Sequence, residues 1–114
     1  DNQALEKRDE LRGMLIAVDA TTVLANRYAD LAAKMAEEES DSKRAEELRQ
    51  ISENCHVVAN ERPKTYWQCI QRYWFIHLAV TSETNPWDAY TPGRLDQHLN
   101  PYYKADVAAG SLDR

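Results

Sequence analysis

The sequence predicts an all-α chain, and two observations carry this prediction. Apolar residues recur at steps of three and four along most of the 114 residues, which is the spacing of one face of a helix. The four prolines and three glycines fall mostly between these periodic segments, where helices end. We therefore expect helices joined by short loops, forming one unit over residues 1–114 with no separate domains.

The first predicted helix ends near Glu39 and carries a long apolar stripe. Gly13 weakens the helix near its beginning, so its first residue is left open. The stripe consists of Leu11, Met14, Leu15, Val18, Thr22, Ala25, Tyr28, Ala29 and Ala32.

A second helix is predicted to begin after Ser40 or Asp41, since either side chain can accept a bond from a free amide of the first turn. Lys43 and Glu47 lie four residues apart on its surface. Its apolar stripe is Ala45, Leu48, Ile51, Cys55 and Val58.

A third helix begins at a capping box, because Thr65 is followed three residues later by Gln68. From Tyr66 to Val80 this helix is apolar on nearly every side. Such a helix must be covered all round, and three short neighbours of mixed polarity would hardly enclose it. We expect its missing cover to belong to a larger body.

A fourth, short helix is predicted from Pro101 to Ala109. Asn100 before a proline is a typical helix start, and Gly110 is suited to the left-handed position after a helix. Residues 111–114 resemble the cap and first turn of another helix, and Asp1 is not a methionine. The chain is therefore expected to be cut from a longer polypeptide.

Composition excludes several classes of partner. The net charge is −5, from 19 acidic and 14 basic residues, which disfavours nucleic acid and anionic lipid. No run is long and apolar enough to span a membrane and no signal-peptide pattern is present, so a cytoplasmic protein is expected. Cys55 and Cys69 lack any metal or disulfide spacing and are expected to be buried free thiols.

Few residues are candidates for chemistry. Asp88 follows Trp87 in a proline-containing loop, and from spacing alone a solvent-facing acid or helix cap is the favoured interpretation. Arg94 and Asp96 follow a Pro-Gly turn, and we interpret them as an ion pair that pins the loop to a helix. His56, His77 and His98 have no metal-binding spacing and are interpreted as structural. No cofactor motif is present, so no metal or bound cofactor is expected.

Two long passages resemble the N-terminal part of glycyl radical enzymes of the pyruvate formate-lyase-like group. They are RYADLAAKMAEEESDSKRAEELRQISENCHVVANERPKTYWQCIQRYWFIHL and GRLDQHLNPYYKADVAAGSLDR. The resemblance implies outer helices of an α/β barrel of ten strands, and a loop that reaches the barrel mouth. It also implies a radical stored on a C-terminal glycine by an iron–sulfur, S-adenosylmethionine-dependent activase, and passed to a mid-chain cysteine. Neither residue is in this chain, which alone should be inactive and holds no catalytic residue.

Within this family the segment ETNPWDAYTPGRLDQHL looks most like choline trimethylamine-lyases, which cleave a carbon–nitrogen bond. That likeness implies that Asp88 binds the substrate alcohol and ammonium, with Trp87, Arg94 and Asp96 in a structural loop near the site. Diol and hydroxyproline dehydratases instead resemble one another through an Asn-Gly-His-type segment. Gly93-Arg94 is shared with sulfonate lyases and aryl-acetate decarboxylases, so these branches stay open. The implied partners are the rest of the barrel, the activase, a small-molecule substrate and a second copy of the parent.

One alternative comes from a different class. A self-contained helical interaction module would use an aromatic surface on the third helix for docking, without any enzymatic role. Its residues would be Tyr66, Trp67, Tyr73 and Trp74.

Overall fold

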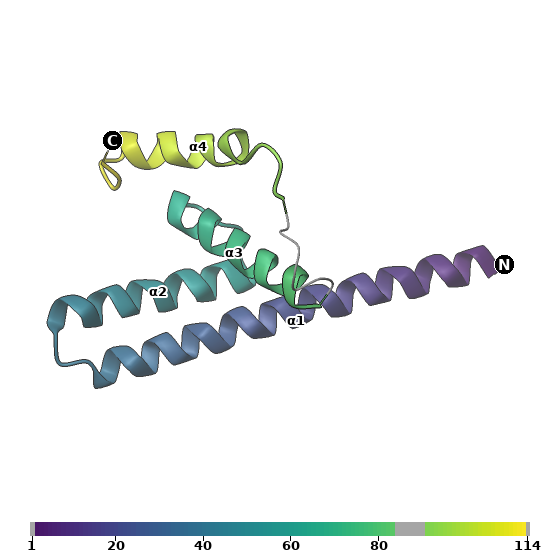
Figure 1. Cartoon of the computed structure of the whole chain (residues 1–114), viewed down its shortest axis with the longest axis horizontal. Helices are drawn as coiled ribbons and strands as arrows, with labels where there is room; N and C mark the ends of the chain where they lie inside the picture. Colours follow the sequence, from purple (N-terminus) through teal and green to yellow (C-terminus); the bar gives the residue numbers. More distant parts are fainter. Residues whose placement is uncertain (1, 84–90, 114) are drawn as a thin grey trace.

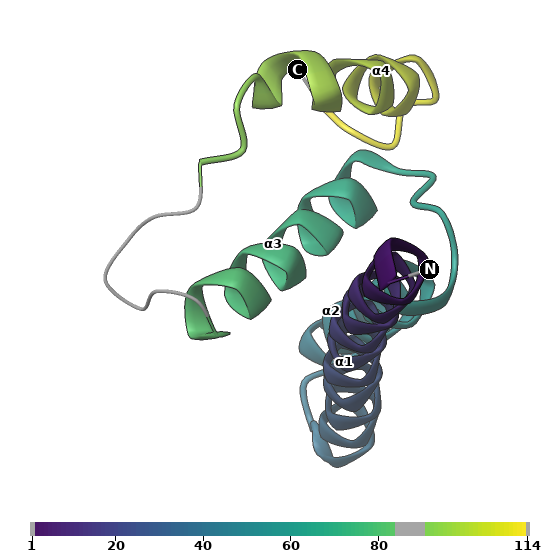
Figure 2. The same ribbon diagram turned by 90° about the vertical axis from the view of Figure 1, so that its right-hand side faces the viewer.

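The structure is a computed structural model that describes residues 2–83 and 91–113. These residues form four helices and no strand: α1 (Asn2–Glu38), α2 (Ser42–Asn60), α3 (Tyr66–Glu83) and α4 (Leu95–Ala108). Helices α1 and α2 form an antiparallel hairpin, α3 crosses it, and α4 lies beyond α3 (Figures 1 and 2). The prediction of an all-α chain is confirmed for the described residues.

Small side chains hold the hairpin of α1 and α2 together. Four alanines of α1 are buried, at spacings of four, three and four residues, and they face the predicted stripe of α2. Because alanine is short, the two backbones approach closely enough for the Ser52 hydroxyl to donate to the Ala29 carbonyl at 2.8 Å. The buried apolar residues of the hairpin are Ala25, Ala29, Ala32, Ala36, Ala45, Leu48, Cys55 and Val58.

The turn between the two helices follows the predicted capping chemistry. Asp41 is the N-cap of α2, and its carboxylate accepts bonds from the amides of Lys43 at 2.9 Å and Arg44 at 3.5 Å. Glu47, which the sequence paired with Lys43, instead forms an ion pair with Arg44 at 2.8 Å. The cap of α2 is therefore confirmed, with Asp41 rather than Ser40.

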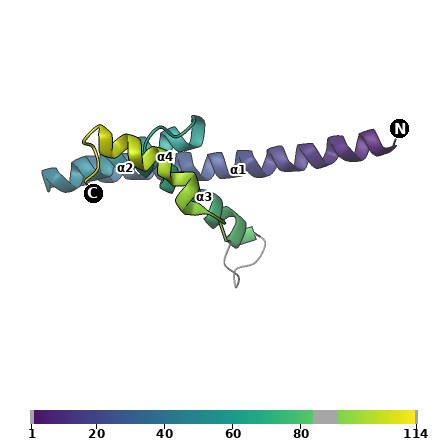
Figure 3. The ribbon, with the colours of Figure 1, turned by 90° about the horizontal axis from the view of Figure 1, so that it is seen from above.

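The first half of α1 extends beyond its neighbours (Figure 3). The helix begins at Asn2, well before Leu11, and Gly13 lies inside it with nothing within 4 Å of the position of a Cβ atom. The early part of the predicted stripe is therefore helical but uncovered. Its exposed members are Leu11, Met14, Leu15 and Val18, which are 56–63% exposed.

Helix α3 begins at the predicted capping box. The Gln68 amide donates to the Thr65 hydroxyl at 3.2 Å, and the Gln68 side chain accepts from the Thr65 amide at 3.4 Å. One face of α3 enters the core through Phe75, whose ring lies 5.8 Å from that of Tyr28. Other large apolar residues of α3 remain open, since Trp67, Ile70, Trp74 and Ile76 are 40–53% exposed. The expectation that this helix is not enclosed by its neighbours is confirmed.

The predicted start of the fourth helix is wrong. Helix α4 begins at Leu95, and Pro101 lies inside it rather than at its first position. The amides of Gln97 and His98 bond to the carbonyl of Arg94 and close the first turn six residues earlier than expected. Asn-Pro marks a start only where no helix precedes it, and an internal proline, although costly, removes a single helical hydrogen bond.

Helix α4 ends just before Gly110, the glycine that the sequence predicted to lie after the helix. Gly110 has φ +72°, and its amide bonds to the Val107 carbonyl at 3.1 Å. The Ser111 amide bonds to the Asp106 carbonyl at 3.0 Å, which completes a Schellman motif. Ser111 thus closes α4. The further helix predicted after it stays a prediction, because its first turn would need residues beyond those that the structure describes.

The four helices leave much of their apolar surface uncovered. The radius of gyration is 17.3 Å, whereas a compact domain of this length has about 13 Å. The accessible surface is 8857 Å², against about 6,400 Å² for a folded monomer of this mass. The excess is roughly three times what one partner buries in a standard protein interface. This surface is what a larger body would cover.

Candidate functional site

The predicted site residues fall on both sides of the start of α4. Trp87 and Asp88 lie outside the described residues, so their placement is not tested. Arg94 is the N-cap of α4 and Asp96 is in its first turn, and both are exposed. Within residues 2–83 and 91–113, neither forms an ion pair with another residue. The roles of all four near a substrate stay predictions.

Arg94 begins α4 through its backbone rather than its side chain. Its carbonyl accepts from the amides of Gln97 at 3.1 Å and His98 at 3.2 Å, while its side chain makes no capping bond. The guanidinium is therefore free of any role in holding the helix start. Asp96 contributes a negative charge to the first turn, where the helix dipole favours it.

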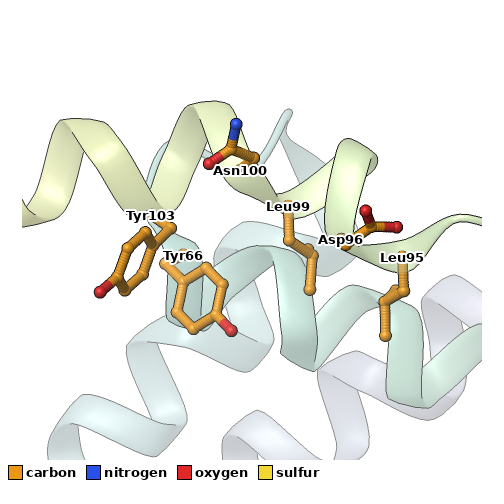
Figure 4. Close-up of a pocket in the computed structure, with 6 residues that line it drawn as sticks. All are labelled: Tyr66, Leu95, Asp96, Leu99, Asn100 and Tyr103. Atoms are coloured by element: carbon orange, nitrogen blue, oxygen red, sulfur yellow. The ribbon is translucent and has the colours of Figure 1, made fainter. Parts of the chain in front are cut away.

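A groove of about 310 Å³ lies between α3 and the first turns of α4. Leu95 and Leu99 point from α4 toward α3, and the polar ends of Asp96 and Asn100 point away from it (Figure 4). The groove floor is therefore apolar and its rim is polar. It is lined by Tyr66, Leu95, Asp96, Leu99, Asn100 and Tyr103.

A joint between the first turn of α3 and the third turn of α4 closes one end of this groove. The Tyr66 amide donates to Oδ2 of Asp106 at 2.8 Å. The ring of Tyr66 meets that of Tyr103 edge to face, with centroids 5.7 Å apart. A side-chain hydrogen bond also joins Tyr102 to Cys69. Sequence reasoning missed this joint, because its partners lie some 40 residues apart in the chain.

The two cysteines sit on helices. Cys55 is 2% exposed in the hairpin core, and burial raises the pKa of its thiol. Cys69 on α3 is half-buried, and burial likewise raises its pKa, against the lowering effects of the Tyr102 hydrogen bond and Arg72. Both are free thiols, as the sequence predicted, although only Cys55 is fully buried.

The three histidines lie on three different helices, α2, α3 and α4. His77 stacks on the ring of Trp74, with centroids 5.6 Å apart and planes 13° apart, which fits the structural role predicted for it. Of the residues that the structure places, no three His, Cys, Asp or Glu side chains gather so that they could hold a metal ion. Nor does any described helix have the length and apolarity to cross a membrane.

These features define a helical segment with partly uncovered apolar faces and no assembled catalytic group among its described residues. The chain belongs to the pyruvate formate lyase-like family, whose sequence model matches residues 1–114. It is 54% identical over 114 residues to trans-4-hydroxy-L-proline dehydratase of Clostridioides difficile, covering 100% of this chain and 14% of the relative. It is 38% identical over 107 residues to isethionate sulfite-lyase of Desulfovibrio desulfuricans, covering 94% of this chain and 13% of that enzyme.

Solved structures agree with the sequence relatives. The crystal structure of hydroxyproline dehydratase from Clostridioides difficile, with trans-4-hydroxy-L-proline bound, matches with a TM-score of 0.92 and 53% identity. That match covers 99% of this chain and 14% of the other. The B12-independent glycerol dehydratase from Clostridium butyricum matches with a TM-score of 0.85 and 33% identity, over 91% of this chain and 13% of that enzyme.

The comparisons confirm the resemblance to glycyl radical enzymes, of whose barrels this chain corresponds to a helical part. They favour the enzyme hypothesis over the interaction module, because the match to an enzyme family spans the whole chain. The chain spans about one-seventh of the length of its curated relatives, at 14% and 13%. Specificity for choline stays a prediction. Hydroxyproline dehydratases, which the sequence analysis placed in a different branch from the choline trimethylamine-lyases, include the relative that is 54% identical to this chain.

Proposed function

We propose that this chain is part of a glycyl radical dehydratase that removes water from trans-4-hydroxy-L-proline. The observation that carries the proposal is the agreement of sequence and backbone with one relative, at 54% identity and a TM-score of 0.92. The isethionate lyase and the glycerol dehydratase follow at 38% and 33% identity. The parent polypeptide supplies the rest of the barrel.

The chemistry lies outside this chain. A glycyl radical, installed by a separate iron–sulfur and S-adenosylmethionine-dependent activase, generates a thiyl radical on a cysteine of the parent. That thiyl radical takes a hydrogen atom from the substrate, the substrate radical loses water, and the resulting radical takes a hydrogen atom back from the cysteine thiol. Cys55 lies in the hairpin core and Cys69 lies on α3, and these helical settings support the placement of the catalytic cysteine elsewhere.

Within the parent, the four helices act as part of the covering layer. Their uncovered surface, which includes Trp74 and the first half of α1, supports this role, because it exceeds what an isolated monomer of this mass exposes. The segment between α3 and α4 reaches the barrel mouth, with Trp87 in that segment, Arg94 at the N-cap of α4 and Asp96 in its first turn near the substrate. The expected homodimer and cytoplasmic location belong to the same proposal.

Asp88 is proposed to bind the substrate. The carboxylate can accept a hydrogen bond from the substrate hydroxyl and attract a positively charged nitrogen. Hydroxyproline carries both groups, as choline does, so the role given to Asp88 fits either substrate. Departure of the hydroxyl of hydroxyproline as water takes up a proton, which Asp88 in its protonated form can supply as a general acid. With choline, the carboxylate can instead accept the hydroxyl proton while trimethylamine leaves.

A second candidate is carbon–nitrogen bond cleavage of choline. The observation that favours it is the Trp87-Asp88-Ala89 stretch before the Pro-Gly turn, which resembles choline trimethylamine-lyases. The two candidates differ in product, because one releases water from a ring and the other releases trimethylamine.

The test uses the full-length parent, activated without oxygen, with each substrate in turn. We expect loss of trans-4-hydroxy-L-proline with formation of its dehydrated product, and no trimethylamine from choline. Asp88→Asn should lower turnover by about a hundredfold or more while the glycyl radical signal stays unchanged. Asp30→Asn, at an exposed acid on α1, is the matched control. Trimethylamine release would replace the first candidate with the second, and full turnover by Asp88→Asn would remove the role of Asp88.

A further inference from the structure

We propose that Asp106 is a positioning residue, whose carboxylate holds α4 against the start of α3 and so fixes where Arg94 and Asp96 lie relative to the substrate. This inference rests on the proposed function, in which the segment leading into α4 lies near the substrate. It adds a residue that neither the sequence nor the comparisons single out.

The first step is the isolation of α4. Among the four helices, α4 packs only against α3, and none of its residues is fully buried. Burial of apolar surface within this chain therefore contributes little to its placement. A few specific contacts must decide how α4 lies against α3.

The second step is the character of the Asp106 contact. Tyr66 is the first residue of α3, and its amide has no acceptor within its own helix. Oδ2 of Asp106 accepts from this amide at 2.8 Å, across 40 residues of sequence. The bond carries a full negative charge at the positive end of the α3 dipole, which makes it stronger than a bond between neutral groups.

The third step is the place of the Asp106 bond in the cap on α3. The Thr65 hydroxyl and the Gln68 side chain satisfy the Gln68 and Thr65 amides, and Asp106 satisfies the Tyr66 amide between them. A residue of α4 is therefore built into the start of α3. Loss of the Asp106 carboxylate leaves the Tyr66 amide without this acceptor and removes the charged link between the helices.

The fourth step connects the joint to the other end of α4. Tyr66 and Tyr103 hold the joint laterally through their edge-to-face contact, while Leu95 and Leu99 line the groove toward the start of α4. Asp106 lies ten residues beyond Asp96, so nearly three turns of helix, each about 5.4 Å long, separate the joint from the start of α4. A small rotation at the joint therefore moves the Arg94 and Asp96 end by a larger distance, since α4 acts as a lever.

The experiment compares full-length parent enzymes carrying Asp106→Ala, Asp106→Asn and the control Asp30→Ala. Amide hydrogen exchange is measured in peptides from α4 and from the α1–α2 hairpin. We expect Asp106→Ala to speed exchange in α4 by about tenfold or more, with the hairpin unchanged. Asp106→Asn keeps an oxygen that can accept from the Tyr66 amide, so it should recover most of the protection.

Enzyme kinetics distinguish a residue that positions the substrate site from one that only stabilises the fold. Asp106→Ala should raise KM for trans-4-hydroxy-L-proline by about tenfold at an unchanged radical content, and Asp106→Asn should restore it largely. The proposal would be overturned if Asp106→Ala left the exchange rate in α4 at its wild-type value, or raised the rate equally in the hairpin. An active Asp106→Ala enzyme with an unchanged KM would overturn it too. A wild type that does not dehydrate hydroxyproline would refute the proposed function instead, and hydrogen exchange would still decide whether Asp106 holds α4.

Discussion

The α1–α2 hairpin and the α3–α4 pair are built in opposite ways. The hairpin buries a row of small residues, and its backbones come close enough for the Ser52 hydroxyl to reach the Ala29 carbonyl. The α3–α4 pair carries large aromatic residues, of which Trp67 is 46% and Trp74 53% exposed, and it meets mainly at the Tyr66–Asp106 joint. The hairpin closes its inner face with its own residues, whereas the first half of α1 and the α3–α4 pair leave apolar side chains open for contacts beyond this chain.

This difference separates the side chains that stabilise this chain by itself from those that would be buried only by the rest of the parent. Phe75 and Trp74 are adjacent on α3 but face different surroundings: Phe75 is 4% exposed and Trp74 is half-exposed. Apolar side chains stabilise a fold in proportion to the area that they remove from water. Substitutions at these two neighbours therefore distinguish the face of α3 that enters the hairpin core from the face that is left open.

The largest effect is expected at Phe75. Phe75→Ala removes the ring that joins α3 to Ala25, Ala29, Cys55 and Val58 of the hairpin, and should lower the free energy of unfolding by about 3–5 kcal/mol. Trp74→Ala should lower it by less than about 1 kcal/mol. Urea unfolding of the 114-residue chain, followed by circular dichroism, measures both. Equal losses would contradict the contrast between the faces of α3. In the full-length parent the Trp74 loss should grow, because the missing cover is present there.

A smaller effect is expected from overpacking the hairpin. Ala29→Leu puts a larger side chain at a buried position of α1 beside Ser52 of α2, so it should cost about 1–3 kcal/mol of unfolding free energy and break the Ser52 bond. Ala20→Leu, at an exposed position of α1, is the control and should change stability by less than about 0.5 kcal/mol. The same urea titration compares them, and a tolerated Ala29→Leu would show that the helices can separate without penalty.

The sequence predicted local structure well where the signal was local. The Asp41 cap, the Thr65–Gln68 box and the left-handed Gly110 each depend on residues within four positions, and all three form. The stripe of α2 was also correct, because an amphipathic helix that packs on a neighbour shows its buried face as a periodicity.

The failures share a physical cause. Asn100-Pro101 gave a strong local start signal, but the turn closed by the Arg94 carbonyl already begins α4 upstream. The Asp106 joint was invisible, because nothing near Asp106 in sequence indicates that Tyr66 lies beside it. The candidate site was predicted from resemblance alone: of its four residues, the structure describes Arg94 and Asp96 and leaves their roles open.

The smallest predicted effect compares the two cysteines, one in each region. Burial raises the pKa of Cys55 and of Cys69, so the folded chain binds these thiol protons more tightly than the unfolded chain does. The resulting stability is present below the ordinary thiol pKa and is lost as the pH rises through the raised values.

Iodoacetamide should modify Cys69 about tenfold faster than Cys55 at pH 8, because Cys55 also needs the hairpin to open. Mass spectrometry of the Cys55→Ser and Cys69→Ser variants measures each rate alone, and equal rates in urea provide the control. Equally fast modification of Cys55 in the folded chain would mean that the hairpin opens as readily as the α3–α4 pair, and would remove the contrast between the two regions.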